Sequence, residues 1–323
     1  MGQRLLPNVA LDVTWSTLIG ALSGALRALD QPVPMNHLMG LTGFAFRITL
    51  TLSDGIVAAA PAAPALDLRR ALPLLENGGR DLEIIDAGTG ARDFAKRRER
   101  ALRALRKGIE RGRPAIAYDL HLPEYGLVHG YDDRAHTLVV STLLSSQYGS
   151  LLAESRWPVP ERASPLIVLL IGGRRRVDQE RALREALRFA LAYAQHGDAG
   201  DPTGSAHGLD AYARWRAAFA RETLIDAAGN ARAIQTVLSA RRDAARFLRE
   251  INETHGSTAS QPLHAAAAAY ERVALVLSRM ATLFPYPSGG DVVSAGVRRL
   301  ASAGLEEAER EERAALASLE AAL

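Results

Sequence analysis

The feature that most constrains the fold is a change of pattern near Gly173. Before this point, amphipathic helical segments alternate with short strand-like runs, among them DLEIIDA, PAIAYDL and HTLVVST. After it, apolar residues recur at helical spacing, and steps of four and three lead from Leu263 to Phe284. The pattern predicts an α+β domain over residues 1–173, with helices on one side of an antiparallel sheet. An all-α helical domain is expected over residues 174–323.

The composition narrows the classes of function. The 323 residues contain no cysteine, which excludes disulfides, thiolate metal sites and a cysteine nucleophile. The formal net charge is only +3, so the composition gives little basis for nucleic-acid binding. The N-terminal stretch lacks the apolar core of a signal peptide, and PLIVLLIGG is too short to span a bilayer. We therefore expect a cytoplasmic protein with neither a nucleic-acid nor a membrane partner.

The stretch DVTWSTLIGAL predicts the start of a helix, with Ser16 or Thr17 at its N-terminus. A hydroxyl at this position could be a nucleophile, because the helix macrodipole stabilises an anion there and a nearby base could accept the proton. The same hydroxyl could instead cap the helix. Ser16, Gly20 and Ser23 form a small-residue face, which predicts that another element approaches this helix closely.

Residues around the run YGLVHGYDD are candidates for the same site. Glu124 could act as a base or bind a cation or an amine, and it could equally be a solvated residue at a strand entry. His129 could serve as a base or be a half-buried strand residue. The two-residue period of a strand predicts that His129 shares a face with Tyr125 and Tyr131.

No metal or cofactor is expected. The histidines of this region, His121, His129 and His136, lack a spacing diagnostic of a metal site. The stretch DAGTGARD has too few glycines for a dinucleotide fingerprint. The stretch GGRRRVDQ lacks the Gly-Lys-Ser/Thr ending of a nucleotide-binding loop, although its glycines and arginines make it a candidate anion site.

The segment GLTGFAFRI supplies the main candidate for ligand binding. Arg47 lies between apolar residues, where it could bind a carboxylate or phosphate, or pair with an acid within the fold. The aromatic residues Trp15, Phe46 and Tyr125 complete the ligand-binding set that we predict. The expected partner is a small molecule or a peptide.

Four segments carry a resemblance to a known family: MGLTGFAFRI, PEYGLVHGYDD, HGLDAYARWRAAF and RRDAARFLREINETH. With these four segments in this order, the chain resembles the butirosin-biosynthesis protein H family over most of its length. The resemblance implies a papain-like, cysteine-peptidase-like N-terminal domain of the bacteriocin-peptidase type, followed by a helical domain. It also implies acyl-transfer or peptidase-like chemistry, with a cysteine at the start of the first long helix and a histidine on a central strand. The segment around Arg47 would adjoin the cleft.

The chain departs from that pattern at each catalytic position. The helix start offers hydroxyl residues but no cysteine. The position six residues before Gly130, where the resemblance implies a histidine, holds Glu124. The acid that the resemblance implies after the next strand would fall near Ser141.

Three hypotheses follow for the function. The first is a degenerate papain-like protein, without catalysis, that binds a small molecule or peptide in the former active-site cleft. The second is an acyltransferase or amidohydrolase that uses Ser16 or Thr17 as the nucleophile, with Glu124 or His129 as the base. The third is an interaction protein of a natural-product or peptide-maturation pathway, with a homodimer formed through the last helices.

Overall fold

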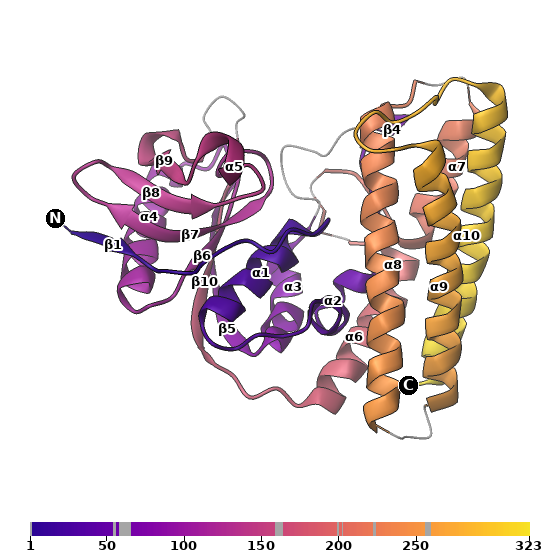
Figure 1. The fold of residues 1–323 in the computed structure, drawn as a ribbon, viewed down its shortest axis with the longest axis horizontal. Helices are drawn as coiled ribbons and strands as arrows, with labels where there is room; N and C mark the ends of the chain where they lie inside the picture. The colour runs from indigo at the N-terminus through magenta and orange to yellow at the C-terminus, as the bar shows by residue number, and fades with distance from the viewer. Residues whose placement is uncertain are drawn as a thin grey trace. The chain divides into compact units, whose positions relative to one another are not determined.

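The computed structural model describes residues 2–53, 56–57, 66–158, 164–198, 200–201, 203–221, 224–255 and 260–323. These residues form two compact units, each described separately below (Figure 1). The first unit contains Met1–Pro34 and Leu68–Val177, and the second contains Met35–Pro61 and Asp178–Leu323. The sequence predicts a single division at residue 173, whereas the chain enters the second unit at Met35 and later returns to the first.

The first unit is a mixed α/β structure built on an antiparallel sheet. Its strands follow the order β5-β10-β6-β7-β8-β9, and β1 pairs with β7. The elements are β1 (Gln3–Leu5), α1 (Thr17–Ala28), α3 (Leu68–Leu75), η2 (Glu76–Gly78), β5 (Arg80–Ala87), α4 (Phe94–Glu110), β6 (Ala115–Tyr118), β7 (Tyr125–Asp132), β8 (Thr137–Ser141), α5 (Ser145–Tyr148), β9 (Leu151–Ala153), η3 (Glu154–Arg156) and β10 (Leu166–Arg174).

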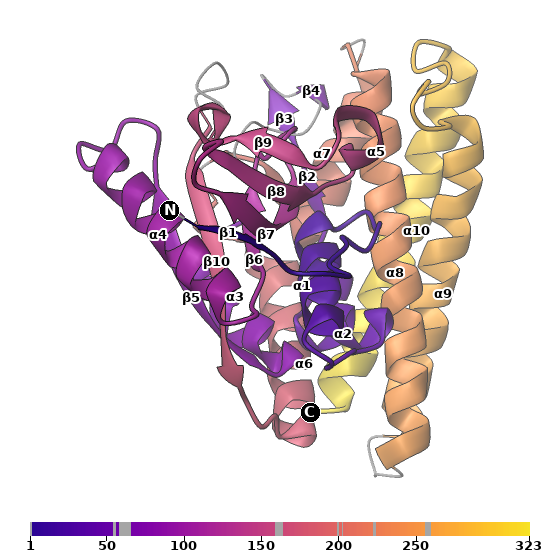
Figure 2. The ribbon, with the colours of Figure 1, turned by 60° about the vertical axis from the view of Figure 1, so that its left-hand side comes forward.

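Helices cover both faces of this sheet, not one face as the sequence predicts. Figure 2 shows α4 on one side of strands β10, β6 and β7 and α1 on the other. Helix α4 turns a narrow apolar stripe, Leu102, Leu105 and Ile109, to the sheet and leaves its many charged residues outside. Helix α1 is apolar or small almost all round, and ten of its twelve residues are buried.

The small-residue face of α1 is used as the sequence predicts. Segment 10–12 crosses α1 so closely that a Cβ on Gly20 would lie 2.2 Å from the carbonyl oxygen of Asp12. Ser23 donates a hydrogen bond of 2.6 Å to the Asp12 carboxylate. Both contacts hold the chain that leads into the helix, and they thereby fix the position of the helix start.

The second unit is predominantly helical. Figure 1 shows its three longest helices, α8, α9 and α10, running side by side. Two small antiparallel pairs, β2 with β11 and β3 with β4, accompany the helices. The elements are α2 (Met35–Leu41), η1 (Phe44–Phe46), β2 (Thr49–Leu50), β3 (Leu52–Ser53), β4 (Ile56–Val57), α6 (Gln179–His196), β11 (Ala206–His207), α7 (Gly208–Ala220), α8 (Ala227–His255), α9 (Ser260–Leu283) and α10 (Ala295–Ala321).

Apolar side chains at helical spacing form the core of the second unit. The predicted seam on α9 is confirmed, because Leu263, Tyr270, Leu277 and Phe284 are all buried. Trp215 is buried as well, and its indole nitrogen donates to Asn230 Oδ1 at 2.8 Å. The partner is needed because an unsatisfied polar group in a core costs about 1–3 kcal/mol.

A buried ion pair ties segment 45–47 to the long helices. Arg241 of α8 and Glu312 of α10 form a bidentate pair with nitrogen–oxygen distances of 2.7 and 2.8 Å. The Arg241 guanidinium also donates to the carbonyl oxygens of Ala45 at 2.7 Å and Arg47 at 3.2 Å. The alternating pattern of GFAFRITLTL predicts a strand, but the structure has the short helix η1 over Phe44–Phe46 and only the two-residue strand β2 over Thr49–Leu50. Gly43, with a φ of 77°, precedes η1, and the guanidinium binds the carbonyls that a sheet would use.

Candidate functional site

The start of α1 meets the start of β7 in the first unit, and two predicted site residues come into contact there. The Thr17 hydroxyl donates a hydrogen bond of 2.5 Å to Glu124 Oε2. The same hydroxyl oxygen accepts a hydrogen bond of 3.2 Å from the backbone N–H of Tyr125. Thr17 is 6% exposed and Glu124 is half-buried, so solvent reaches this contact only in part. The sequence places the two residues 107 positions apart, and the fold brings them together.

Glu124 is positioned by a tight loop between β6 and β7. The backbone N–H of Asp119 donates to the carbonyl oxygen of Glu124 at 3.0 Å, which closes the loop. Asp119 has a φ of 54° in the left-handed region, where aspartate is tolerated better than most residues. Its buried carboxylate accepts a hydrogen bond from Ser164, and the Trp157 indole donates to the carbonyl of Tyr118 at 2.8 Å. No local pattern in the sequence marks the role of Asp119.

Ser16 lies directly before α1, at the N-cap position, but its side chain makes no capping hydrogen bond. The capping role considered for its hydroxyl is therefore not seen, and the Ser16 carbonyl instead accepts from Gly20 N at 2.9 Å. Trp15, the preceding residue, is half-buried. Ser141, at the expected position of an acid, accepts a hydrogen bond of 2.9 Å from the Leu11 backbone.

Tyr125 is buried beside this contact. Its ring packs edge-on against Tyr118 with centroids 5.1 Å apart. Burial, with a smaller contribution from Tyr118, raises the pKa of the Tyr125 hydroxyl well above its usual value. That hydroxyl has no hydrogen-bond partner among the residues that the structure describes. Tyr125 therefore remains neutral in the physiological range and cannot serve as a base.

His129 lies in a β-bulge of β7. For this reason the prediction that the side chains of Tyr125, His129 and Tyr131 share one face of the strand is wrong. The register of β7 against β8 shifts between Val128 and Gly130. A bulge adds one residue, which reverses the alternation of side chains beyond it. Before the bulge, the Leu127 side chain lies toward α1. Its Cδ1 is 3.2 Å from the position that a Cβ on Gly24 of α1 would occupy. After the bulge, Tyr131 lies toward α4, where its ring contacts the Arg106 guanidinium at 5.7 Å.

The imidazole of His129 is engaged by backbone. Its Nδ1 lies 3.2 Å from the carbonyl oxygen of Leu6, to which it can only donate. Burial lowers the pKa of His129, although the carbonyls of Leu6 and Val140 oppose that shift. His129 is four residues from Tyr125 along the strand, roughly 13 Å at the usual rise per residue. A role for His129 as the base for Thr17 is not supported by this spacing.

Arg47 and Phe46 belong to the second unit, so the predicted residues do not gather within one unit. Arg47 pairs with Asp198 at 3.1 Å, and its guanidinium lies 4.8 Å from the ring centres of Phe189 and Tyr193. Phe46 is 3% exposed and packs beside Tyr270. The fold thus engages both side chains, and their role in ligand binding remains a prediction.

A second polar cluster, which the sequence analysis did not identify, lies in the second unit. His207 Nε2 is 2.8 Å from Asp201 Oδ2, and His207 Nδ1 is 2.9 Å from the Tyr193 hydroxyl. Burial acts to raise the pKa of Asp201, but hydrogen bonds from Thr203 and His207 outweigh it and lower that pKa. The Tyr193 hydroxyl lies 2.8 Å from the carbonyl of Ile48. All of these side chains face one another, so the cluster supports a structural role.

The arrangement at the start of α1 can hold a proton between a hydroxyl and a carboxylate, but it lacks an imidazole. No group of three or more His, Asp or Glu residues that could hold a metal ion occurs within the described ranges. None of the helices in the described part of the chain is both long and apolar enough to cross a membrane.

No protein-family model matches the chain, and a comparison with curated proteins found no match.

Proposed function

We propose that the first unit is a papain-like domain that has lost catalysis and that the protein binds a small molecule or peptide. The observation that carries this proposal is the contact between Thr17 and Glu124. The resemblance assigns the nucleophile to the start of the first long helix and the histidine base to the position of Glu124. Contact between these two positions supports a papain-like arrangement with other residues in both roles.

The chemistry of this pair argues against a catalytic role. A hydroxyl is about as weak an acid as water, so its pKa lies far above that of an ordinary glutamate, which is ~4. Proton transfer from the hydroxyl to such a carboxylate would cost on the order of 15 kcal/mol, at about 1.4 kcal/mol per pKa unit. A cysteine–histidine pair has nearly matched pKa values and avoids this cost. Thr17 and Glu124 therefore serve to join α1 to β7.

One observation favours an alternative function, an acyltransferase or amidohydrolase. Thr17 stands at the N-terminus of a twelve-residue helix, where the macrodipole favours an anion, and a carboxylate is within hydrogen-bond distance. A substrate that desolvates Glu124 would raise its basicity. The two functions differ in whether the Thr17 oxygen ever becomes covalently modified.

Labelling with a fluorophosphonate probe separates the two functions. Wild type, Thr17→Val and Ser16→Ala are treated with the probe and analysed by intact-protein and peptide mass spectrometry. The proposal expects no labelling of the peptide that contains Thr17 in any of the three proteins. Labelling of Thr17 in the wild type and in Ser16→Ala, lost in Thr17→Val, would establish the hydroxyl as a nucleophile and refute the proposal.

Stability measurements test the structural role of the same residue. Thr17→Val leaves the buried N–H of Tyr125 without its acceptor, which should lower the free energy of unfolding by about 1–3 kcal/mol. Ser16→Ala is the matched control, because the Ser16 side chain caps nothing, and it should change stability by less than about 0.5 kcal/mol. Equal stability of Thr17→Val and wild type in urea denaturation would contradict the structural role.

A further inference from the structure

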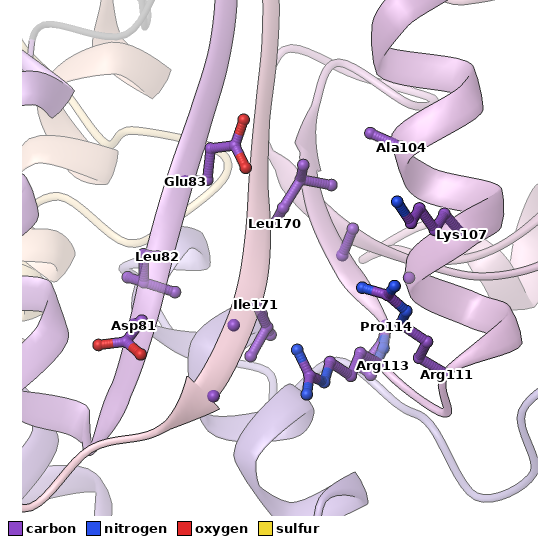
Figure 3. A pocket seen from close by; sticks show the side chains of 14 residues that line it. Asp81, Leu82, Glu83, Ala104, Lys107, Arg111, Arg113, Pro114, Leu170 and Ile171 are labelled. Atoms are coloured by element: carbon purple, nitrogen blue, oxygen red, sulfur yellow. The ribbon is translucent and has the colours of Figure 1, made fainter.

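A cavity of about 460 Å³ lies in the first unit, between the C-terminal half of α4 and the sheet. Strands β5, β10 and β6 form one side, with Leu82, Leu170 and Ile171 as apolar lining. The other side comes from α4 and the turn that follows it. Figure 3 shows Lys107, Arg111 and Arg113 extending from this side toward the strands.

The three cations of the cavity differ from the arginines of α4. Five arginines of that helix have partners in the fold. They are Arg97 with Asp93, Arg98 with the Trp157 carbonyl, Arg100 with Glu83, Arg103 with Glu99 and Arg106 with Asp133. No ion pair or side-chain hydrogen bond joins Lys107, Arg111 or Arg113 to another residue that the structure describes. The arginines of α4 thus have partners in the fold, and the three cations that line the cavity have none among the described residues. Lys96, in the first turn of α4, also lacks such a partner, but it lies outside the cavity.

The charges that line the cavity do not balance. Its two carboxylates are Asp81 and Glu83, and Glu83 is already paired with Arg100 at 2.9 Å. Three cations against Asp81 leave a surplus of two positive charges. Arg80, next to the cavity, has its pKa lowered by burial and then by the nearby Arg113 and Arg174. These arginines repel one another, and a bound anion would relieve the repulsion.

We propose that this cavity binds a small organic dianion, with a phosphomonoester as the favoured class. The surplus of two charges matches a phosphate dianion, and arginine donors suit its oxygens. The volume lies within the range of small-molecule sites and exceeds what inorganic phosphate needs, so the apolar lining is available for the organic part. The cavity is separate from the contact between Thr17 and Glu124. Of its lining residues, the sequence indicated only Gly172 and Gly173, as part of the candidate anion site GGRRRVDQ.

Helix geometry alone offers a competing explanation for these cations. Lys107 and Arg111 lie at the C-terminal end of α4, where positive charge favours the helix macrodipole. Arg113 lies beyond the helix, beside Arg80, and gains little from the macrodipole. Arg113→Gln therefore separates the two explanations. It should leave the stability of the ligand-free protein unchanged or raise it, because it removes a repulsion.

Isothermal titration of the full chain with phenyl phosphate tests the proposal, with Arg113→Gln, Arg111→Gln and the control Arg103→Gln. Arg103 lies on the same helix but outside the cavity, paired with Glu99. Saturable binding to the wild type is expected, with a loss of about tenfold or more in each cavity variant, as for one charge-assisted hydrogen bond. Arg103→Gln should bind within about twofold of wild type. Inorganic phosphate should bind more weakly than phenyl phosphate.

Three results would overturn the proposal. The first is the absence of saturable binding of phenyl phosphate to the wild type at millimolar concentration. The second is an equal loss in Arg103→Gln and Arg113→Gln, which would indicate general attraction to a basic helix. The third is a thermal melting temperature of ligand-free Arg113→Gln well below that of the wild type, which would assign the guanidinium a structural role. None of these results depends on whether Thr17 is catalytic.

Discussion

Removing the charge of Glu312 should destabilise the second unit severely. Glu312 is the only carboxylate paired with Arg241 among the described residues, and the Arg241 side chain is 0% exposed. Glu312→Gln keeps the size of the side chain but leaves a buried guanidinium without a counter-charge. Burial acts to lower the pKa of Arg241, but Glu312 raises it overall, so the arginine stays charged when its partner is present.

The expected magnitude follows from the contacts of the pair. Removing one partner of a buried ion pair costs about 3–5 kcal/mol, so Glu312→Gln and Arg241→Met should each lose that much. The double variant removes both charges and leaves the carbonyls of Ala45, Phe46 and Arg47 without their donor. At about 1–3 kcal/mol for each carbonyl, the double variant should lose about 3–9 kcal/mol. This loss should stay below the sum of the two single losses, because the double variant leaves no buried charge unpaired.

Hydrogen–deuterium exchange measured on peptides of α8, α9 and α10 is the appropriate assay, because a chain with two units need not unfold in one step. Glu307→Gln is the matched control. Glu307 also lies on α10, but its pair with Arg279 is exposed and should contribute less than about 1 kcal/mol. A loss below about 1 kcal/mol in Glu312→Gln would refute the reasoning, as would a double variant that loses the full sum.

Three further changes have definite expected outcomes. Burial raises the pKa of Asp243 to about 6, so its ionisation opposes folding as the pH rises through that value. Asp243→Asn should therefore be more stable than wild type at pH ~7 and equally stable near pH ~4, in urea titrations at both pH values. The lowered pKa of Asp201 means that its contribution is present above about pH 4 and lost on acidification. Asp201→Asn should thus destabilise at neutral pH, and the difference should vanish in strong acid. Gly20→Ala should lower the melting temperature by several degrees, because its Cβ would overlap the Asp12 carbonyl, and an unchanged melting temperature would contradict the close crossing.

Local patterns in the sequence predicted the features that depend on local physics. The small-residue face of α1, the seam on α9 and most strands of the antiparallel sheet follow from spacing alone. The sequence offered Ser16 or Thr17 with Glu124 or His129, and of these the structure brings Thr17 and Glu124 into contact. The residues of the α1 face, of the α9 seam and of each strand lie on a single element. Thr17 and Glu124 lie at the starts of a helix and a strand that the sequence pattern indicates.

The features that the sequence did not reveal depend on residues far apart in the chain. Nothing local marks the bulge at His129, and one extra residue was enough to reverse the expected facing of Tyr131. The segment around Arg47 alternates like a strand, but a guanidinium 194 residues away binds its carbonyl. The cavity cations were equally hidden, because the pattern of α4 does not show which of its basic residues find acidic partners.

The assignment of Met35–Pro61 to the second unit has a consequence for folding during synthesis. This segment is synthesised before Arg241, which follows Arg47 by 194 residues, and before Glu312, which pairs with Arg241. Synthesis at about 5–20 residues per second leaves the segment without its native contacts for roughly ten seconds or longer. Phe46 and Ile48, which are buried in the folded unit, cannot complete their native packing until that interval has passed.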